Sequence, residues 1–320
     1  MALFNAGLII REVRAGKGLT QTQLAEGICS RQTISGIENG ERKPDWFIFK
    51  AIATRLGLNP DDYYNGIASE NDVYLVQKVQ ECVGYIQTFN FDAVKKLTEE
   101  MEADRKFLQC GDMAQTFLLR FKANLYAQGT YKDSTAAKAH ALACLRINRP
   151  DFEVEKITDY YLSDDECILI SLLAIIIKDL EGLPKALEIW LALKQNYEKN
   201  YKLNNFTQAY RDLCTNIAMA FKHLERFEEC LKAAEEGITQ SLSYHDMRTY
   251  SRYLYLKGWS LLKLGRTEEG EEVYKKFLLF AYVVDGYAAI NFETVKKEYT
   301  EAFHNQLELS APWHSPPPEK

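Results

Sequence analysis

Two neighbouring side chains, Arg31 and Gln32, have the chemistry to read the edges of nucleic-acid bases. An arginine guanidinium can donate two hydrogen bonds to one guanine, and a glutamine amide can both donate to and accept from one adenine. These contacts discriminate between bases only when a rigid element carries the side chains into the major groove. A solvated helix face is the plainer alternative for the same two residues.

The stretch Leu19–Gly40, LTQTQLAEGICSRQTISGIENG, can supply that element. Thr20 is predicted to cap a first short helix, because its hydroxyl can accept a hydrogen bond from the backbone three residues on. Gln23 stands where a capping-box side chain reaches back. After a tight turn, Ser30 is predicted to cap a second helix, which Asn39-Gly40 ends.

The segments LTQTQLAEGI, SRQTISGIENG and ERKP resemble the phage-repressor and Cro type of helix-turn-helix found in Xre-like regulators, over roughly residues 5 to 65. The resemblance implies five short helices, with the third entering a DNA major groove. It also implies an ion pair between Arg14 and Glu38 that ties the first helix to the end of the recognition helix.

Two further residues join Arg31 and Gln32 as predicted base readers. Thr33 and Ser35 can touch a thymine methyl group or a phosphate. Gly36 has no side chain where many such repressors carry a long polar one, so readout at that step is expected to be lost or to depend on DNA shape.

Phosphate contacts are predicted at the ends of the second and third helices, from Gln21, Asn39, Arg42 and Lys43. Lys43 is equally compatible with a solvated charge. Residues 1–66 carry a net charge of +1 and the remainder carries −7, within the total of −6. The acidic remainder is an unsuitable nucleic-acid surface, so DNA contact is expected from the N-terminal unit alone.

The length of 320 residues predicts two domains. No secretory leader or membrane span is recognised, so the protein is expected to be cytoplasmic. The seven cysteines form no C-x-x-C pair and are interpreted as reduced packing residues. Catalytic motifs and clustered histidines are missing from the sequence. The chain is therefore predicted to be neither an enzyme nor a carrier of a cofactor or metal.

Beyond residue 66 the sequence repeats. The small and apolar positions between residues 218 and 234 recur at a constant offset of 40 between residues 258 and 274. Five helix pairs are predicted, near 73–105, 113–146, 165–198, 207–240 and 247–281, with a closing helix near 287–308. They resemble degenerate tetratricopeptide repeats. The predicted domains are 1–66 for the helix-turn-helix, 67–72 for a linker, 73–309 for the repeats and 310–320 for a disordered tail.

In a stacked array of helix pairs, the first helices of successive repeats line a concave groove for an extended peptide. Asparagine is informative there, because its amide can donate to and accept from a peptide backbone. The predicted peptide-binding residues are Arg120, Asn124, Lys178, Asp212, Asn216, Lys222, Arg252, Tyr255 and Trp259. Ordinary surface polarity is the alternative for each of them.

The predicted fold is all-α, with a five-helix helix-turn-helix domain followed by a tetratricopeptide-like right-handed α-solenoid. This architecture resembles the peptide-responsive (RRNPP-type) quorum-sensing regulators that include Rgg, PlcR and PrgX. The resemblance implies a homodimeric transcription factor that binds a two-fold symmetric DNA operator and is switched by a short signalling peptide, with no membrane partner. The alternative is a repeat scaffold, or a regulator controlled by a partner protein.

Overall fold

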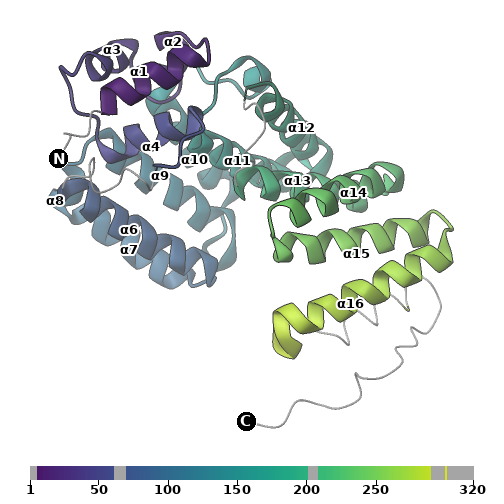
Figure 1. Cartoon of the computed structure of the whole chain (residues 1–320). Helices are drawn as coiled ribbons and strands as arrows, with labels where there is room; N and C mark the ends of the chain where they lie inside the picture. Colours follow the sequence, from purple (N-terminus) through teal and green to yellow (C-terminus); the bar gives the residue numbers. More distant parts are fainter. Residues whose placement is uncertain (1–5, 61–69, 201–207, 290–299, 301–320) are drawn as a thin grey trace. The chain divides into compact units, whose positions relative to one another are not determined.

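The computed structural model describes residues 6–60, 70–200, 208–289 and residue 300. Contacts divide the chain into two compact units, residues 1–209 and residues 210–320. Helices build both units, and the described ranges contain no strand (Figure 1). The predicted all-α class is confirmed. No helix within these ranges is long and apolar enough to cross a bilayer.

Four helices form the N-terminal domain of the first unit. They are α1 (Ala6–Gly16), α2 (Gln21–Ala25), α3 (Arg31–Glu38) and α4 (Trp46–Arg55). The fifth helix expected from residue 59 and the linker expected at 67–72 fall mostly outside the described residues. The helix-turn-helix pair itself, α2 and α3, lies where the sequence predicts it.

The predicted caps set the bounds of α2 and α3. The Thr20 hydroxyl accepts from the Gln23 amide N–H at 3.1 Å, and the Gln23 side-chain oxygen accepts from the Thr20 N–H at 2.8 Å. Ser30 Oγ accepts from the backbone N–H of Thr33 at 3.1 Å. Of the predicted Asn39-Gly40 stop, Gly40 supplies the left-handed residue, with φ of +75°.

Apolar residues from all four helices form one core in this domain. Its innermost side chains, with at most 1% exposure, are Ile10, Leu24, Ile34, Ile37, Phe49, Ile52, Ala53 and Leu56. Because Ile34 and Ile37 lie one turn apart, burying both leaves the opposite face of α3 toward solvent.

Three helix pairs complete the first unit. They are α6 (Glu70–Gln87) with α7 (Phe91–Ala103), α9 (Asp112–Ala127) with α10 (Ser134–Asn148), and α11 (Asp164–Glu181) with α12 (Leu183–Asn200). Short α8 (Arg105–Leu108) and η3 (Val154–Asp159) lie between successive pairs, and η2 (Gly129–Tyr131) lies between α9 and α10. These pairs agree with those predicted near 73–105, 113–146 and 165–198.

The second unit contains the last two predicted pairs. Its helices are α13 (Gln208–His223, from Tyr210 onward), α14 (Phe227–Ser243), α15 (Met247–Lys263) and α16 (Thr267–Ala289). Most of the closing helix expected at 287–308, and all of the tail expected at 310–320, lie outside the described residues. The helical repeat domain is thus confirmed over the described part of the chain.

Small residues let neighbouring helices of the second unit approach closely. Cys230 Sγ in α14 lies 3.3 Å from the Ala218 carbonyl oxygen in α13. A Cβ added at Gly258 in α15 would stand 3.1 Å from the Tyr274 nitrogen in α16. The recurrence at an offset of 40 therefore marks the positions where helix backbones meet.

We expect Gly237→Val to lower the free energy of unfolding by about 1–3 kcal/mol in urea titrations, through overpacking. A Cβ at Gly237 would lie 2.3 Å from the ring of Tyr253, which is buried in α15. In α6, Gly84→Val is the control, because a Cβ there would meet no atom within 4 Å. It should change stability by less than about 0.5 kcal/mol. Equal effects at the two positions would contradict close helix approach at Gly237.

Candidate DNA interface and repeat groove

An ion pair holds the recognition helix α3 against α1. Arg14 Nε donates to Glu38 Oε1 at 2.5 Å, and Arg14 Nη2 donates to Glu38 Oε2 at 2.9 Å. Arg14 Nη1 also donates to the Leu19 carbonyl at 2.7 Å, and Gln21 Nε2 donates to Glu38 Oε2 at 2.9 Å. The structure therefore contains the predicted ion pair between Arg14 and Glu38. The hydrogen bond from Gln21 also connects α2 to Glu38.

Glu38 is charged although it is buried. Only 2% of its side chain is exposed. Burial by itself raises the pKa of Glu38, but hydrogen bonds from Arg14 and Gln21 outweigh burial and hold the pKa below its usual value. The carboxylate thus stays ionised at neutral pH and keeps α1, α2 and α3 together.

The two best predicted base readers lie on the open face of α3. Arg31 and Gln32 are its first two residues, and both are exposed. Ser30 caps the helix directly before them, and Ile34 and Ile37 anchor the opposite face in the core. The side chains of Arg31 and Gln32 consequently start from a rigid backbone and point away from the domain interior.

Thr33 differs from the other predicted base readers. It is buried, and its hydroxyl lies 3.0 Å from Ser30 Oγ. Arg42 Nη1 donates to the same hydroxyl at 3.4 Å. Thr33 therefore supports the start of α3 in this conformation, because its side chain faces the domain rather than an open surface.

The remaining predicted DNA residues surround the open face of α3. Ser35 is half-buried, while Arg42 and Lys43 are exposed. Asn39 is exposed and its amide donates to Glu41 Oε1 at 3.5 Å. Gln21 uses one amide hydrogen for Glu38, which leaves the second for a phosphate.

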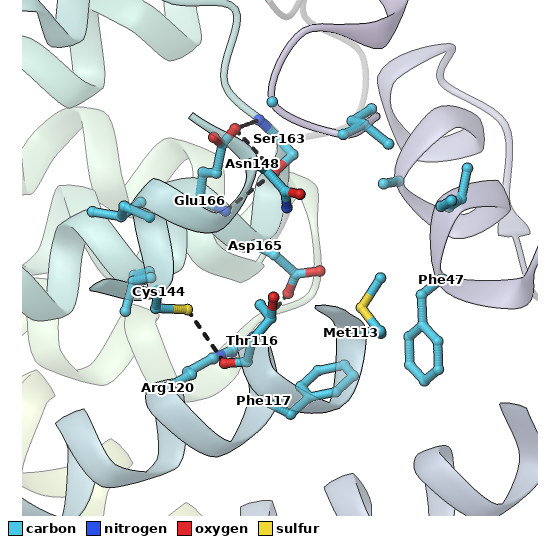
Figure 2. A pocket seen from close by; sticks show the side chains of 16 residues that line it. Phe47, Met113, Thr116, Phe117, Arg120, Cys144, Asn148, Ser163, Asp165 and Glu166 are labelled. Atoms are coloured by element: carbon cyan, nitrogen blue, oxygen red, sulfur yellow. Dashed lines mark hydrogen bonds and ion pairs between the residues drawn. The ribbon is translucent and has the colours of Figure 1, made fainter. Parts of the chain in front are cut away.

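A cavity lies where the N-terminal domain meets the second and third helix pairs, and we call it the junction cavity (Figure 2). Its empty space is about 650 Å³, including space open to solvent. Phe47 and Ile48 of α4 line one side, and Met113 and Phe117 of α9 line another. The Phe47 and Phe117 rings meet edge to face with centroids 5.0 Å apart. Its walls are mainly apolar, with a few polar groups from α9, α10 and α11.

Two further hollows continue along α6, α9 and α11, and α4 of the N-terminal domain also lines the larger one through Trp46, Phe47 and Lys50. Together we call them the repeat groove. Their volumes are about 1800 and 490 Å³, including space open to solvent. Arg120 lines both hollows and the junction cavity. Its Nη1 donates to Asp165 Oδ1 at 2.8 Å, and Asn124 Nδ2 donates to the Arg120 carbonyl at 3.0 Å. Two predicted peptide-binding residues, Arg120 and Asn124, thus lie together in a groove.

The other predicted peptide-binding residues are Lys178 of the first unit and six residues of the second unit. Lys178 is exposed in the last turn of α11. In the second unit, the Lys222 ammonium lies over two rings, 4.7 Å from Tyr255 and 4.4 Å from Trp259, and donates to the Tyr255 hydroxyl. Trp259 is buried, so it offers little surface to a ligand.

The second unit contains three further predicted residues, Asp212, Asn216 and Arg252. Asp212 and Arg252 are exposed, and Asn216 is half-buried. Five of the nine predicted residues thus contact one another in two groups, Arg120 with Asn124 in the first unit, and Lys222 with Tyr255 and Trp259 in the second.

Sequence reasoning missed the apolar and acidic lining of the groove. Phe47, Phe117 and Asp165 come from three helices, and no local pattern links them. One signal was available, because Ser163 and Glu166 have the spacing of a capping box. The structure contains this box, with the Ser163 N–H donating to Glu166 Oε2 at 2.8 Å (Figure 2). It places Asp165 in the first turn of α11, facing Arg120.

All seven cysteines are free thiols, and Cys82, Cys144, Cys167 and Cys230 are buried. Burial raises the pKa of Cys82 to about 12, so this thiol is protonated at neutral pH. Within the described ranges, no group of three or more histidine, cysteine, aspartate or glutamate residues could hold a metal ion.

Comparison with known proteins agrees with both domains. The helix-turn-helix family matches residues 10–63, and a tetratricopeptide repeat matches residues 251–281. No curated protein matches the chain by sequence. PlcR of Bacillus thuringiensis, solved in complex with the peptide PapR7 and DNA, is 21% identical with a TM-score of 0.56. The similarity covers 94% of this chain and 99% of that chain.

Two other solved structures are similar over most of their length. A putative transcriptional regulator from Listeria monocytogenes is 18% identical, with a TM-score of 0.49, covering 95% of this chain and 100% of that chain. The pheromone receptor Rgg2 of Streptococcus dysgalactiae is 15% identical, with a TM-score of 0.44 and the same coverages.

The chain therefore combines a helix-turn-helix domain with a tetratricopeptide-like repeat domain. It has the fold of PlcR, so the resemblance to this regulator is confirmed at the level of the fold.

We expect Arg14→Met to reduce the free energy of unfolding by about 3 kcal/mol at neutral pH, because it leaves the Glu38 carboxylate buried without its cation. Arg11→Met, an exposed position on the same helix, is the matched control and should stay within about 0.5 kcal/mol. Urea titration measures both.

The loss of unfolding free energy in Arg14→Met should become smaller as the pH falls. Because the folded pKa of Glu38 is lowered, the stabilisation by this pair is complete above the unfolded pKa of about 4.3. It is lost as pH falls through the folded pKa. The difference from the unchanged protein should therefore shrink below about pH 4. A deficit that grows toward acid would contradict this assignment.

Proposed function

We propose that this protein is a sequence-specific DNA-binding transcriptional regulator whose repeat domain binds a short signalling peptide that controls operator binding. The observation that carries the DNA-binding half is the geometry of α3. Arg31 and Gln32 are exposed at its capped start, and the ion pair of Arg14 with the buried Glu38 carboxylate anchors its end. A fork-shaped donor and an amide on a fixed helix are what base readout requires.

Homodimerisation follows from the weak electrostatics of one N-terminal domain. A net charge of +1 over residues 1–66 gives a small phosphate contribution to affinity. Two copies reading half-sites about 34 Å apart would supply the missing affinity. The operator should then have two-fold symmetry, and the protein should act in the cytoplasm.

The repeat groove supports a peptide as the ligand. Arg120, Asn124 and Gln80 interrupt walls of Val83, Phe117 and similar residues. An extended peptide can place apolar side chains on such walls while the polar groups bind its backbone. In the solved complex of PlcR, that protein holds a peptide and DNA together. No catalytic role is proposed.

The DNA-binding half is tested by gel shift on the DNA upstream of the protein's own gene, against a scrambled duplex of equal composition. The double variant Arg31→Ala with Gln32→Ala should reduce the preference for the natural duplex at least about tenfold, since each pair contributes ~1–3 kcal/mol.

Lys43→Ala is the control for that experiment, because loss of a phosphate contact should weaken binding to both duplexes alike. Full selectivity in the double variant would contradict the assignment of the base readers.

The peptide-binding half is tested with short apolar peptides encoded beside the gene. One of them should change the mobility shift of the unchanged protein. Arg120→Ala with Asn124→Ala should abolish that response while leaving DNA affinity without peptide unchanged. Lys122→Ala, on the same helix α9 but paired with Glu102, should respond normally. A normal response in the double variant would exclude this part of the groove.

A further inference from the structure

An ion pair between residues far apart in sequence joins the turn of the helix-turn-helix to the repeat domain. Glu26, directly after α2, accepts through Oε1 from Arg149 Nη1 at 3.1 Å and from the Tyr161 N–H at 3.3 Å. Arg149 is the C-cap residue of α10, and its Nε donates to Glu166 Oε1 at 3.4 Å. Arg149 thus lies between a carboxylate of the N-terminal domain and one of the repeats.

A second arginine completes the attachment from the N-terminal side. Arg55 of α4 donates through Nη1 to the carbonyls of Leu24 at 2.9 Å and Glu26 at 2.6 Å, at the end of α2. Its Nη2 donates to the Tyr161 carbonyl at 3.0 Å, and its guanidinium lies 4.9 Å from the centre of the Tyr161 ring. The Arg55 side chain therefore donates hydrogen bonds both to the turn and to the segment before α11.

The turn is also in steric contact with the repeats. Gly27 has a φ of +70°, and a Cβ there would lie 2.2 Å from Glu166 Oε2. Glu166 is buried, and Arg149 opposes the rise in the pKa of Glu166 that burial causes. The backbone conformation favours glycine at this position, and the ends of the Glu166 and Arg149 side chains lie directly against it.

We propose that Glu26 and Arg149 are positioning residues for operator recognition, which hold the reading helix at one angle to the repeat domain and so fix the half-site spacing that a dimer accepts. This inference rests on the proposed DNA-binding function. Arg31 follows Glu26 by five residues across a capped turn, so a turn held in place holds α3 in place.

The consequence for DNA is a steep dependence on spacing. Inserting one base pair between half-sites moves one of them by about 3.4 Å and rotates it by about 34°. A reading domain fixed to its dimer cannot follow that change, whereas a loosely tethered one can. Spacing preference therefore separates the positioning role from a general contribution to stability.

The test uses the full-length protein and a set of duplexes in which the distance between half-sites changes in steps of one base pair. The unchanged protein should bind one spacing at least about tenfold more tightly than its neighbours, which corresponds to about 1.4 kcal/mol. In Glu26→Ala this preference should fall below about threefold. Affinity for a single isolated half-site should not change.

Three further variants sharpen the result. Glu26→Gln keeps an oxygen that can accept from Arg149 and Tyr161, so its spacing preference should lie between those of the unchanged protein and Glu26→Ala. Arg146→Ala removes an exposed arginine of α10 and should behave like the unchanged protein. Arg149→Ala should match Glu26→Ala if it folds. Glu26→Ala remains decisive because it leaves the pair of Arg149 and Glu166 in place.

Unaltered spacing preference in Glu26→Ala would overturn the positioning role and leave the proposed function standing. An unchanged protein that binds every spacing and every sequence equally would overturn both. Reduced single half-site affinity in Glu26→Ala, with the spacing preference retained, would also overturn the positioning role.

Discussion

The N-terminal domain depends on the interactions of one buried carboxylate, that of Glu38, with side chains from two other helices. An ionised group in a protein interior is tolerated only when charges and hydrogen bonds surround it. Arg14 from α1 and Gln21 from α2 meet this requirement, so three helices converge on one residue at the end of α3. These contacts fix α3 relative to α1 and α2, and so orient its open face, which carries Arg31 and Gln32.

The same principle recurs where the N-terminal domain meets the repeats. Glu166 is buried at the start of α11, where burial raises its pKa and Arg149, which also reaches Glu26, opposes that rise. The next residue toward the N-terminus, Asp165, pairs with Arg120 in the repeat groove. The first turn of α11 thus contacts both the groove and the helix-turn-helix.

Local signals were enough to predict most helices. Thr20, Ser30 and Gly40 mark helix ends through caps whose chemistry lies within a few residues, and the structure contains each of them. The repeats were predictable because helix pairs must place small residues where backbones meet, as at Gly258.

Contacts between distant segments were not predictable in this way. Glu26 and Arg149 are 123 residues apart, and neither belongs to a motif. Thr33 was predicted to be a base reader because it lies on α3, and in the structure its hydroxyl contacts Ser30 and Arg42. Predicting these side chains requires the packing of one helix on another, which sequence spacing does not specify.

Selection of bound duplexes from a random DNA pool by the purified full-length protein tests the central claim most directly. The account predicts enrichment of one motif, made of two inverted half-sites about one helical turn apart. Recovery of sequences with no shared motif would contradict the claim that the N-terminal domain reads DNA.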